Sequence, residues 1–251
     1  MTSFLRHQKR VSDAKLTFME NQLRLHYAPD NASLIIRLAL YELEVPFETV
    51  LVDRATREQD SKAYRRLNPN GLIPVLETHQ GPIFETGAIL LWLVDKYASL
   101  GPDISSPQRG EFLKWLFFLS NTVHPELRQF FYPSIYVGDD QRAIHALRAQ
   151  RAITLPVHLA KLDHQVGEQS FLLGSKMSVL DIYLCCMIRW MGLYPVGHTD
   201  WFDLATTSNL NNLAKKMECR GSVVQSIKVE GLGATPFSAP TLANPPEGTA
   251  T

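Results

Sequence analysis

The sequence predicts an α/β domain followed by an all-α domain. Strand and helix patterns alternate over residues 22–98, a linker rich in Pro, Gly and Ser covers 99–107, and the apolar spacing of 108–228 is helical throughout. We therefore expect a small sheet covered by helices and joined to a helical bundle. These parts lie between a loose N-terminal extension over 1–21 and a tail over 229–251 that is rich in Pro, Gly, Thr and Ala and is expected to be disordered.

The first half opens with a strand, a breaker and a helix. Residues LRLHY (23–27) place apolar side chains at alternate positions, which is typical of a strand with one preferred face. The strand ends before Pro29, and the stretch 33–44 repeats apolar residues at i and i+4, as on an amphipathic helix. The β-branched and aromatic run 46–53 predicts a second strand.

The rest of the first half predicts a turn, a hairpin and a helix. A polar stretch with helical potential (54–67) leads to the turn NPNG (68–71). Residues 72–78 and 82–84 predict a short antiparallel hairpin, and 85–97 a helix. Two strands separated by a helix are expected to pair in parallel through a right-handed crossover. The order β-α-β-α-β-β-α is a thioredoxin-like layout with a mixed four-stranded sheet.

The second half contains only helix patterns. Apolar residues recur at helical spacing over 110–123, after which Pro125 should bend or restart the helix. A long helix is expected over about 140–168. The run 178–192 is apolar nearly all round, as in a central buried helix, and 209–218 closes the bundle.

Composition argues against several classes of protein. The 251 residues carry 25 Lys+Arg and 25 Asp+Glu, so there is no net charge to attract nucleic acid or an anionic membrane. No apolar run comes close in length to a membrane-spanning helix, which needs about 20 residues.

Three cysteines are too few for a disulfide framework and favour a reducing compartment; the adjacent Cys185 and Cys186 are expected to pack in the core. Eight histidines lack paired ligand spacing, so no metal is inferred. The basic N-terminal stretch has no apolar core, which favours a loose extension with Met19 as a candidate start.

Four stretches together resemble the cytosolic glutathione S-transferase superfamily over roughly 23–228: YAPDNASLIIRLAL, NPNGLIPVL, FETGAILLWL and GSKMSVLDIYL. The nearest resemblance is to the bacterial beta class, in which the first strand ends in Tyr, Pro comes soon after it, and a His lies in the first long helix of the second domain. Tyr27, Pro29, Ser33 and His124 fall at matching places. The resemblance implies glutathione as co-substrate and a cytoplasmic, two-fold homodimer that acts in detoxification.

The reaction that this resemblance implies is addition of the glutathione thiolate to a small hydrophobic electrophile. A thiol titrates near pH 8.5, and lowering its pKa by two units requires about 2.7 kcal/mol in favour of the thiolate. A helix N-terminus contributes up to about 2 kcal/mol, and a hydrogen bond to a charged acceptor about 1.5–3 kcal/mol. The helix after the first strand supplies the first contribution, and Ser33, Asn31 or, third in order, Tyr27 supplies the second.

Three positions depart from the relatives. Ala32 replaces the beta-class cysteine, which removes mixed-disulfide chemistry. Asp30 takes the place of the activating serine of zeta-type enzymes, where a carboxylate can cap the helix but also repels a thiolate. Leu72 stands where relatives often carry a polar residue that holds the tripeptide. Structural roles for the candidates stay open: Asn31 as a helix cap, Ser33 as a first-turn residue and Tyr27 as a core tyrosine.

The resemblance also assigns the two halves of the site. Pro74 should follow a cis peptide bond, and the backbone of Ile73 should pair with the cysteinyl backbone of glutathione, as in strand addition. Thr86, at a helix start, suits the γ-glutamyl carboxylate, and Glu85 can accept from its ammonium. The electrophile should lie between the domains, beside His124, although that histidine could also be structural. The aromatic residues expected there are Phe130, Phe131, Tyr132 and Tyr136.

Two other functions stay open. One is a specialised glutathione-dependent lyase of the ether-cleaving type, which would use the same thiolate differently. The other is a non-catalytic ligand-binding or assembly protein with the same fold, which Asp30, Ala32 and Leu72 favour. Retention on immobilised glutathione, followed by a conjugation assay with an aryl halide, separates a transferase from the non-catalytic protein.

Overall fold

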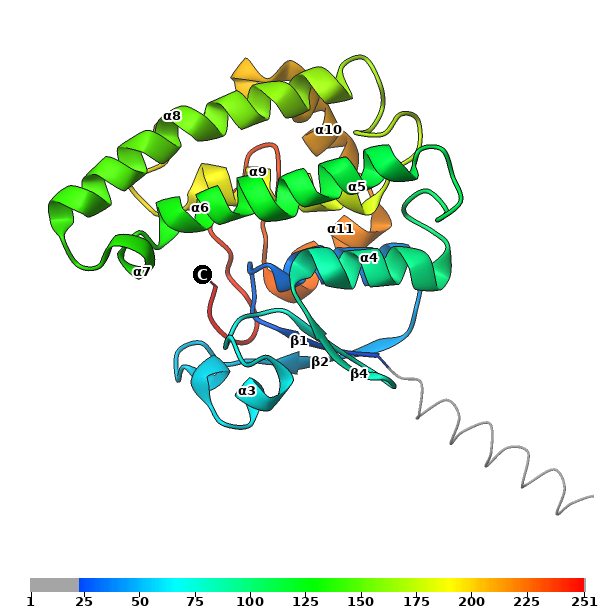
Figure 1. The fold of residues 1–251 in the computed structure, drawn as a ribbon, viewed down its shortest axis with the longest axis horizontal. Coiled ribbons are helices and arrows are strands. Elements are labelled where there is room, and N and C mark those ends of the chain that lie inside the picture. The colour runs from blue at the N-terminus through cyan, green and yellow to red at the C-terminus, as the bar shows by residue number, and fades with distance from the viewer. Residues whose placement is uncertain (1–22, 251) are drawn as a thin grey trace, which may run out of the picture.

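The computed structural model of this chain describes residues 23–250, so the expected N-terminal extension lies outside the described residues. A four-stranded sheet with helices on both faces forms the first half, and helices form the second (Figure 1). The strands are β1 (Leu23–Tyr27), β2 (Phe47–Leu51), β3 (Val75–Thr78) and β4 (Gly81–Phe84).

The sheet has the order β2-β1-β3-β4. β1 pairs in parallel with β2, with Leu25 opposite Thr49, whereas the β1–β3 and β3–β4 pairs are antiparallel. Helix α2 (Ser33–Glu42) makes the crossover between the two parallel strands. The predicted mixed, thioredoxin-like domain is therefore confirmed.

Two layers of helix enclose this sheet. α4 (Thr86–Tyr97) lies on the face toward the helical half, while α3 (Tyr64–Leu67), preceded by the 3-10 turn Glu58–Asp60, lies on the opposite face (Figure 1). α2 is buried from Ser33 to Leu40, because it packs against β1 as well as α4 and α9. Such burial on nearly all sides places the start of α2 at the junction of the two halves.

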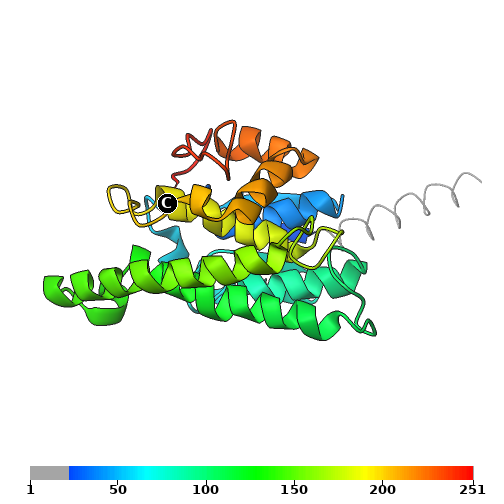
Figure 2. The ribbon, with the colours of Figure 1, turned by 90° about the horizontal axis from the view of Figure 1, so that it is seen from above.

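The helical half is built around α9. Its helices are α5 (Arg109–Phe118), α6 (His124–Phe131), α7 (Ser134–Val137), α8 (Gln141–Val166), α9 (Val179–Leu193), α10 (Ser208–Glu218) and α11 (Gly221–Glu230). Seen from above, α9 lies between the α5, α6 and α8 layer and the α10 and α11 layer (Figure 2). Cys185 and Cys186 are fully buried in α9, as predicted, and burial raises the pKa of both thiols well above its usual value. A capping box of Ser178 and Asp181 starts the helix.

A π-helical segment, Leu119–Val123, joins α5 to α6. Pro125, in the first turn of α6, lacks the N–H that a continuing α-helix would use. The wider turn just before it accommodates this loss, and the helix restarts at His124, as the sequence predicts for Pro125. The π segment brings Ser120 and Asn121 to the cavity described below.

The segment after α11 differs from the disorder expected over 229–251. It runs back from α11 toward the sheet (Figure 1). Leu232 and Phe237 are buried, and the Asn244 N–H donates to the Gly231 carbonyl at 2.9 Å. The Pro, Gly, Thr and Ala content suggested disorder, but Leu232 and Phe237 anchor the segment in the core, and its backbone carbonyls accept hydrogen bonds from Arg189.

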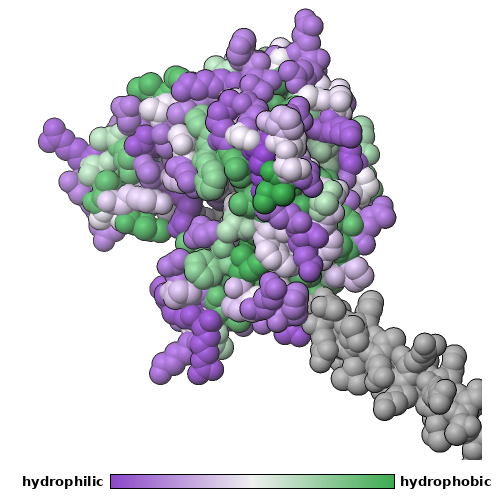
Figure 3. All heavy atoms as spheres, turned by 45° about the vertical axis from the view of Figure 1, so that its right-hand side comes forward, coloured by the Kyte–Doolittle hydropathy of each residue, from purple (hydrophilic) through white to green (hydrophobic). Residues whose placement is uncertain are grey.

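The visible surface is mixed in character. Hydrophobic residues form small groups among hydrophilic ones on the face drawn in Figure 3. None of the helices within residues 23–250 has the length and apolar character needed to cross a membrane.

Candidate functional site

A cavity of about 780 Å³ lies where the start of α2, the start of α4 and the α5–α6 helix meet. Its volume is in the usual range for small-molecule sites. Of the residues predicted from sequence, those on its wall are Asn31, Ile73, Pro74, Glu85, Thr86, His124, Phe131, Tyr132 and Tyr136. The structure therefore brings the predicted glutathione residues and most of the predicted electrophile residues to one cavity.

One wall is formed by the loop before β3 and the start of α4. The Ile73–Pro74 peptide bond is cis, as predicted. Thr86 is the first residue of α4 and is nearly buried. Glu85, just before it, has a φ of 71°, a left-handed conformation that is unfavourable for a non-glycine residue. Backbone N–H groups at a helix start bind anions, so this corner suits a carboxylate beside a cation.

The start of α2 forms the next part of the wall. The N-cap position is Ala32, and within residues 23–250 no side chain caps the helix and no acidic residue lies in its first turn. Asn31 faces the same cavity, and its Oδ1 is buried without a hydrogen-bond partner in the described part of the chain. The helix N-terminus favours an anionic ligand group there. The Asn31 amide can donate to such a group through its nitrogen, while its Oδ1 can accept from a donor of the ligand.

Two of the three predicted thiol-activating residues lie elsewhere. The hydroxyl of Ser33 is fully buried; it donates to the Ala28 carbonyl at 3.0 Å and accepts from the Ala28 N–H at 3.2 Å. The hydroxyl of Tyr27 is hydrogen-bonded to Glu247 in the C-terminal segment, and burial, aided by this carboxylate, raises its pKa. Ser33 and Tyr27 therefore hold the fold together, which corrects the expectation that they face the sulfur.

Phe130, expected beside the electrophile, lies in the core and not on the cavity wall. Its ring is buried and packs edge-on against Trp201 at a centroid distance of 5.4 Å. The neighbouring Phe131 and Tyr132 face the cavity instead, because α6 ends there and the chain turns.

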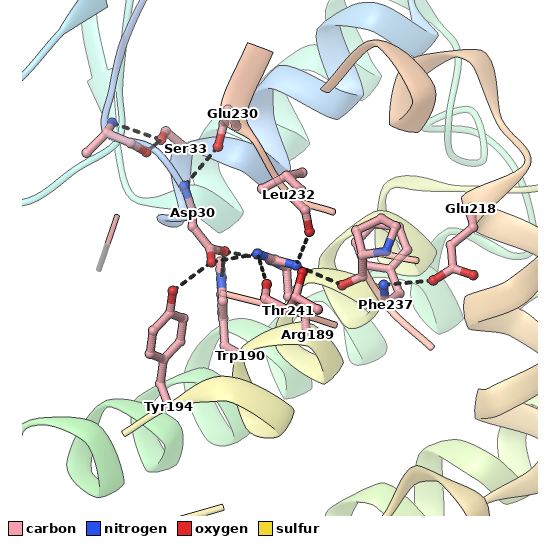
Figure 4. A network of polar contacts seen from close by, with 12 residues as sticks. Asp30, Ser33, Arg189, Trp190, Tyr194, Glu218, Glu230, Leu232, Phe237 and Thr241 are labelled. Atoms are coloured by element: carbon pink, nitrogen blue, oxygen red, sulfur yellow. Dashed lines mark hydrogen bonds and ion pairs between the residues drawn. The ribbon is translucent and has the colours of Figure 1, made fainter. Parts of the chain in front are cut away.

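Asp30 points away from the place where it was expected to act. Its φ of 49° turns the buried carboxylate toward α9, where it accepts hydrogen bonds from Arg189 Nε (2.8 Å) and Nη2 (2.9 Å) (Figure 4). It also accepts from Trp190 Nε1 at 3.0 Å and from the Tyr194 hydroxyl at 2.7 Å. The carboxylate therefore neither caps α2 nor presents an uncompensated charge to a thiolate. The Asp30 N–H donates to Glu230, at 2.9 Å.

Arg189 uses all five of its N–H groups. Two go to Asp30, and the other three go to backbone carbonyls of the C-terminal segment (Figure 4). Those carbonyls belong to Leu232 (3.0 Å), Pro236 (3.2 Å) and Thr241 (3.1 Å). Sequence analysis missed this pairing, although an arginine within an apolar helix is a usable signal, since a buried arginine requires partners.

His124 pairs with a tyrosine at the cavity wall. Its Nδ1 lies 2.8 Å from the Tyr183 hydroxyl, and the two groups share a hydrogen bond. Burial, with a smaller contribution from Arg128, lowers the pKa of His124 to about 4. At neutral pH the ring can exchange a hydrogen bond with a ligand but carries no charge.

Two arginines on the cavity wall were not foreseen. Arg54 follows β2 and Arg128 lies on α6, and both are half-buried. Neither guanidinium has a hydrogen bond or an ion pair with another residue in the range 23–250. Their charges are available to a bound ligand.

The sheet domain, the helical domain and the cavity between them define a two-domain protein of the thioredoxin-like class. Residues 21–95 match the family model described as glutathione S-transferase, N-terminal domain. Glutathione S-transferase F10 of Arabidopsis thaliana is 32% identical over 153 residues, which cover 58% of this chain and 69% of that protein. The chain belongs to the glutathione S-transferase family.

Solved structures agree with this assignment. A sphingomonad glutathione S-transferase complexed with glutathione is 30% identical, with a TM-score of 0.70, and the match covers 84% of this chain and 100% of that one. A beta class glutathione S-transferase of Sphingomonas chungbukensis is 29% identical, with a TM-score of 0.69 and coverage of 83% and 98%. The predicted similarity to the bacterial beta class is confirmed.

Proposed function

We propose that this protein is a glutathione transferase that joins the glutathione thiolate to small hydrophobic electrophiles bound in the 780 Å³ cavity. The observation that carries the proposal is that Asn31 and the uncapped start of α2 lie on the cavity wall that also holds Thr86. A thiolate and a γ-glutamyl carboxylate are two anions of one tripeptide, and each has a helix N-terminus beside it.

Four residues account for the rest of the tripeptide. Thr86 and the first N–H groups of α4 bind the γ-glutamyl carboxylate, and Glu85 accepts from its ammonium. The backbone of Ile73 pairs with the cysteinyl backbone. Arg54, which also lines the cavity, binds the glycyl carboxylate.

Asn31 is the residue that we assign to the sulfur. Its amide nitrogen donates a hydrogen bond to the thiolate, which adds about 1.5–3 kcal/mol to the up to about 2 kcal/mol from the helix start. At their upper ends the two contributions together reach about 5 kcal/mol, which is more than the about 2.7 kcal/mol that a two-unit lowering of the thiol pKa requires. The electrophile lies against the neutral His124 and the rings of Phe131 and Tyr132.

Calorimetric titration with glutathione tests binding, and turnover of 1-chloro-2,4-dinitrobenzene tests activity. We expect Thr86→Ala to weaken glutathione binding at least about ten-fold. Thr49→Ala, on the exposed part of β2, is the matched control and should bind as the wild type does. Failure of the wild type to bind glutathione contradicts the proposal and leaves the non-catalytic ligand-binding or assembly function.

A lyase of the ether-cleaving type is the second candidate, because the same thiolate would attack a carbon that bears an ether oxygen. Release of a phenol from an aryl ether, without turnover of the aryl halide, would favour it. By the family resemblance we also propose a cytoplasmic, two-fold homodimer; light scattering should give twice the 28.4 kDa chain mass.

A further inference from the structure

One charged group on the cavity wall has no role in the function proposed above. Arg128 lies on α6, one turn after His124, and faces the cavity beside Phe131, Tyr132 and Tyr136. It is half-buried, and no acceptor in the described part of the chain pairs with its guanidinium. Other sheltered arginines of this protein are paired: Arg189 with Asp30, and Arg37 with Glu230 at 2.6 Å. A partly sheltered guanidinium without an acceptor can pair with an anionic group of a ligand in the cavity.

The anions of glutathione do not supply that partner. In the proposed function they lie against Thr86, Arg54 and Asn31, and all three come from the first half of the chain. Arg128 comes from the second half, on the electrophile side. The carboxylates that line the cavity are those of Asp30, which Arg189 already pairs, and Glu85, which stands at the glutathione end.

We infer that Arg128 is a specificity residue that selects electrophiles bearing a carboxylate on an apolar body. The inference rests on the proposed function. A guanidinium binds a carboxylate through two parallel N–H···O bonds, and the pair is strongest where water is partly excluded. The neighbouring aromatic rings of Phe131, Tyr132 and Tyr136 supply the apolar surface that the body of such a molecule would cover.

The chemistry at sulfur is unchanged by this choice of substrate. With an aryl chloride, the thiolate sulfur forms a bond to the ring carbon, and the carbon–chlorine bond breaks with its electron pair leaving on chloride. Arg128 holds the carboxylate throughout and exchanges neither electrons nor protons. It therefore affects which electrophile binds, whereas Asn31 affects how readily the thiol ionises.

A pair of binding ligands tests the inference without turnover. S-benzylglutathione and S-(4-carboxybenzyl)glutathione differ by one carboxylate, and calorimetry gives the affinity of each. We expect the wild type to prefer the carboxylated ligand, and Arg128→Gln to reduce that preference at least about ten-fold. Arg128→Lys should keep part of the preference. Arg142→Gln, an exposed arginine of α8, is the matched control and should keep all of it.

Turnover gives the second readout. We compare 4-chloro-3-nitrobenzoate with 4-chloro-3-nitrobenzamide, and in Arg128→Gln the loss of kcat/KM for the acid should exceed that for the amide at least about ten-fold. Equal losses for both substrates, or a preference that Arg128→Gln leaves intact, overturn the inference while the transferase function stands. If the wild type binds neither glutathione conjugate, the proposed function and this inference both fail.

Discussion

Asp30 and Arg189 form a buried pair of parallel hydrogen bonds, 2.8 and 2.9 Å long, between positions 159 apart in the sequence. Neither side chain is exposed. The pair connects the loop before α2 to α9, and Arg189 in turn holds the C-terminal segment through its backbone carbonyls (Figure 4). The loop that presents Asn31 to the cavity is thus fixed to α9 by the Asp30–Arg189 pair.

Removing one partner of this pair should destabilise the protein strongly. Asp30→Asn leaves the Arg189 guanidinium buried without its counter-ion, and we expect a loss of about 3–5 kcal/mol in the free energy of unfolding. Urea denaturation measures this free energy. Asp139→Asn, an exposed aspartate before α8, is the matched control and should change stability by less than about 0.5 kcal/mol. Equal stability of the two variants would show that the pair does not hold the loop.

Ser33→Ala should affect folding and spare the chemistry. The hydroxyl satisfies the N–H and the carbonyl of Ala28 at a buried position, so its loss should lower the free energy of unfolding by about 1–3 kcal/mol. The pKa of bound glutathione should stay as in the wild type, because this hydroxyl is directed away from the cavity. A raised thiol pKa with unchanged stability would return Ser33 to the role that the sequence suggested.

The C-terminal segment should contribute to stability through its buried anchor. Phe237 is 1% exposed, and truncating a buried phenylalanine to alanine lowers stability by about 3–5 kcal/mol. Leu242, in the same segment, is 54% exposed, and Leu242→Ala should be nearly neutral. Thermal unfolding of the two variants measures the difference. Identical curves would mean that the segment does not pack as described.

His124 should make the folded state sensitive to moderate acid. Its pKa is lowered to about 4 in the fold, whereas an unfolded histidine titrates near 6.5. Between these values the unfolded chain binds the extra proton, so stability should fall as pH falls from about 6.5 to 4. His124→Gln should flatten this part of the stability profile, and His145→Gln, an exposed histidine of α8, should leave it unchanged. A slope that survives His124→Gln would assign it to other groups.

Much of the sheet domain could be predicted because its signals are local. Alternation marks β1, the 3.6-residue period marks α2, and the Gly-containing turns mark the ends of strands. The same locality explains why Thr86 and Glu85 could be placed at a helix start.

The choice among Tyr27, Asn31 and Ser33 could not be made from the sequence. It depends on the left-handed backbone of Asp30, which turns its carboxylate toward α9 and sets the direction of the residues that follow. That conformation is held by Arg189, 159 positions away, and no local pattern reports such a partner. The same arginine also holds the C-terminal segment. Because composition does not reveal such a distant partner, it suggested disorder there.

The pKa of glutathione bound to the protein tests the central claim most directly. It is measured by ultraviolet titration of the thiolate in the wild type, in Asn31→Ala and in Ser33→Ala. We expect the bound thiol of the wild type to ionise about two units below the usual 8.5, and Asn31→Ala, but not Ser33→Ala, to raise that pKa by at least about one unit. A bound thiol that titrates near 8.5 in the wild type, or the same pKa in Asn31→Ala, would contradict the account.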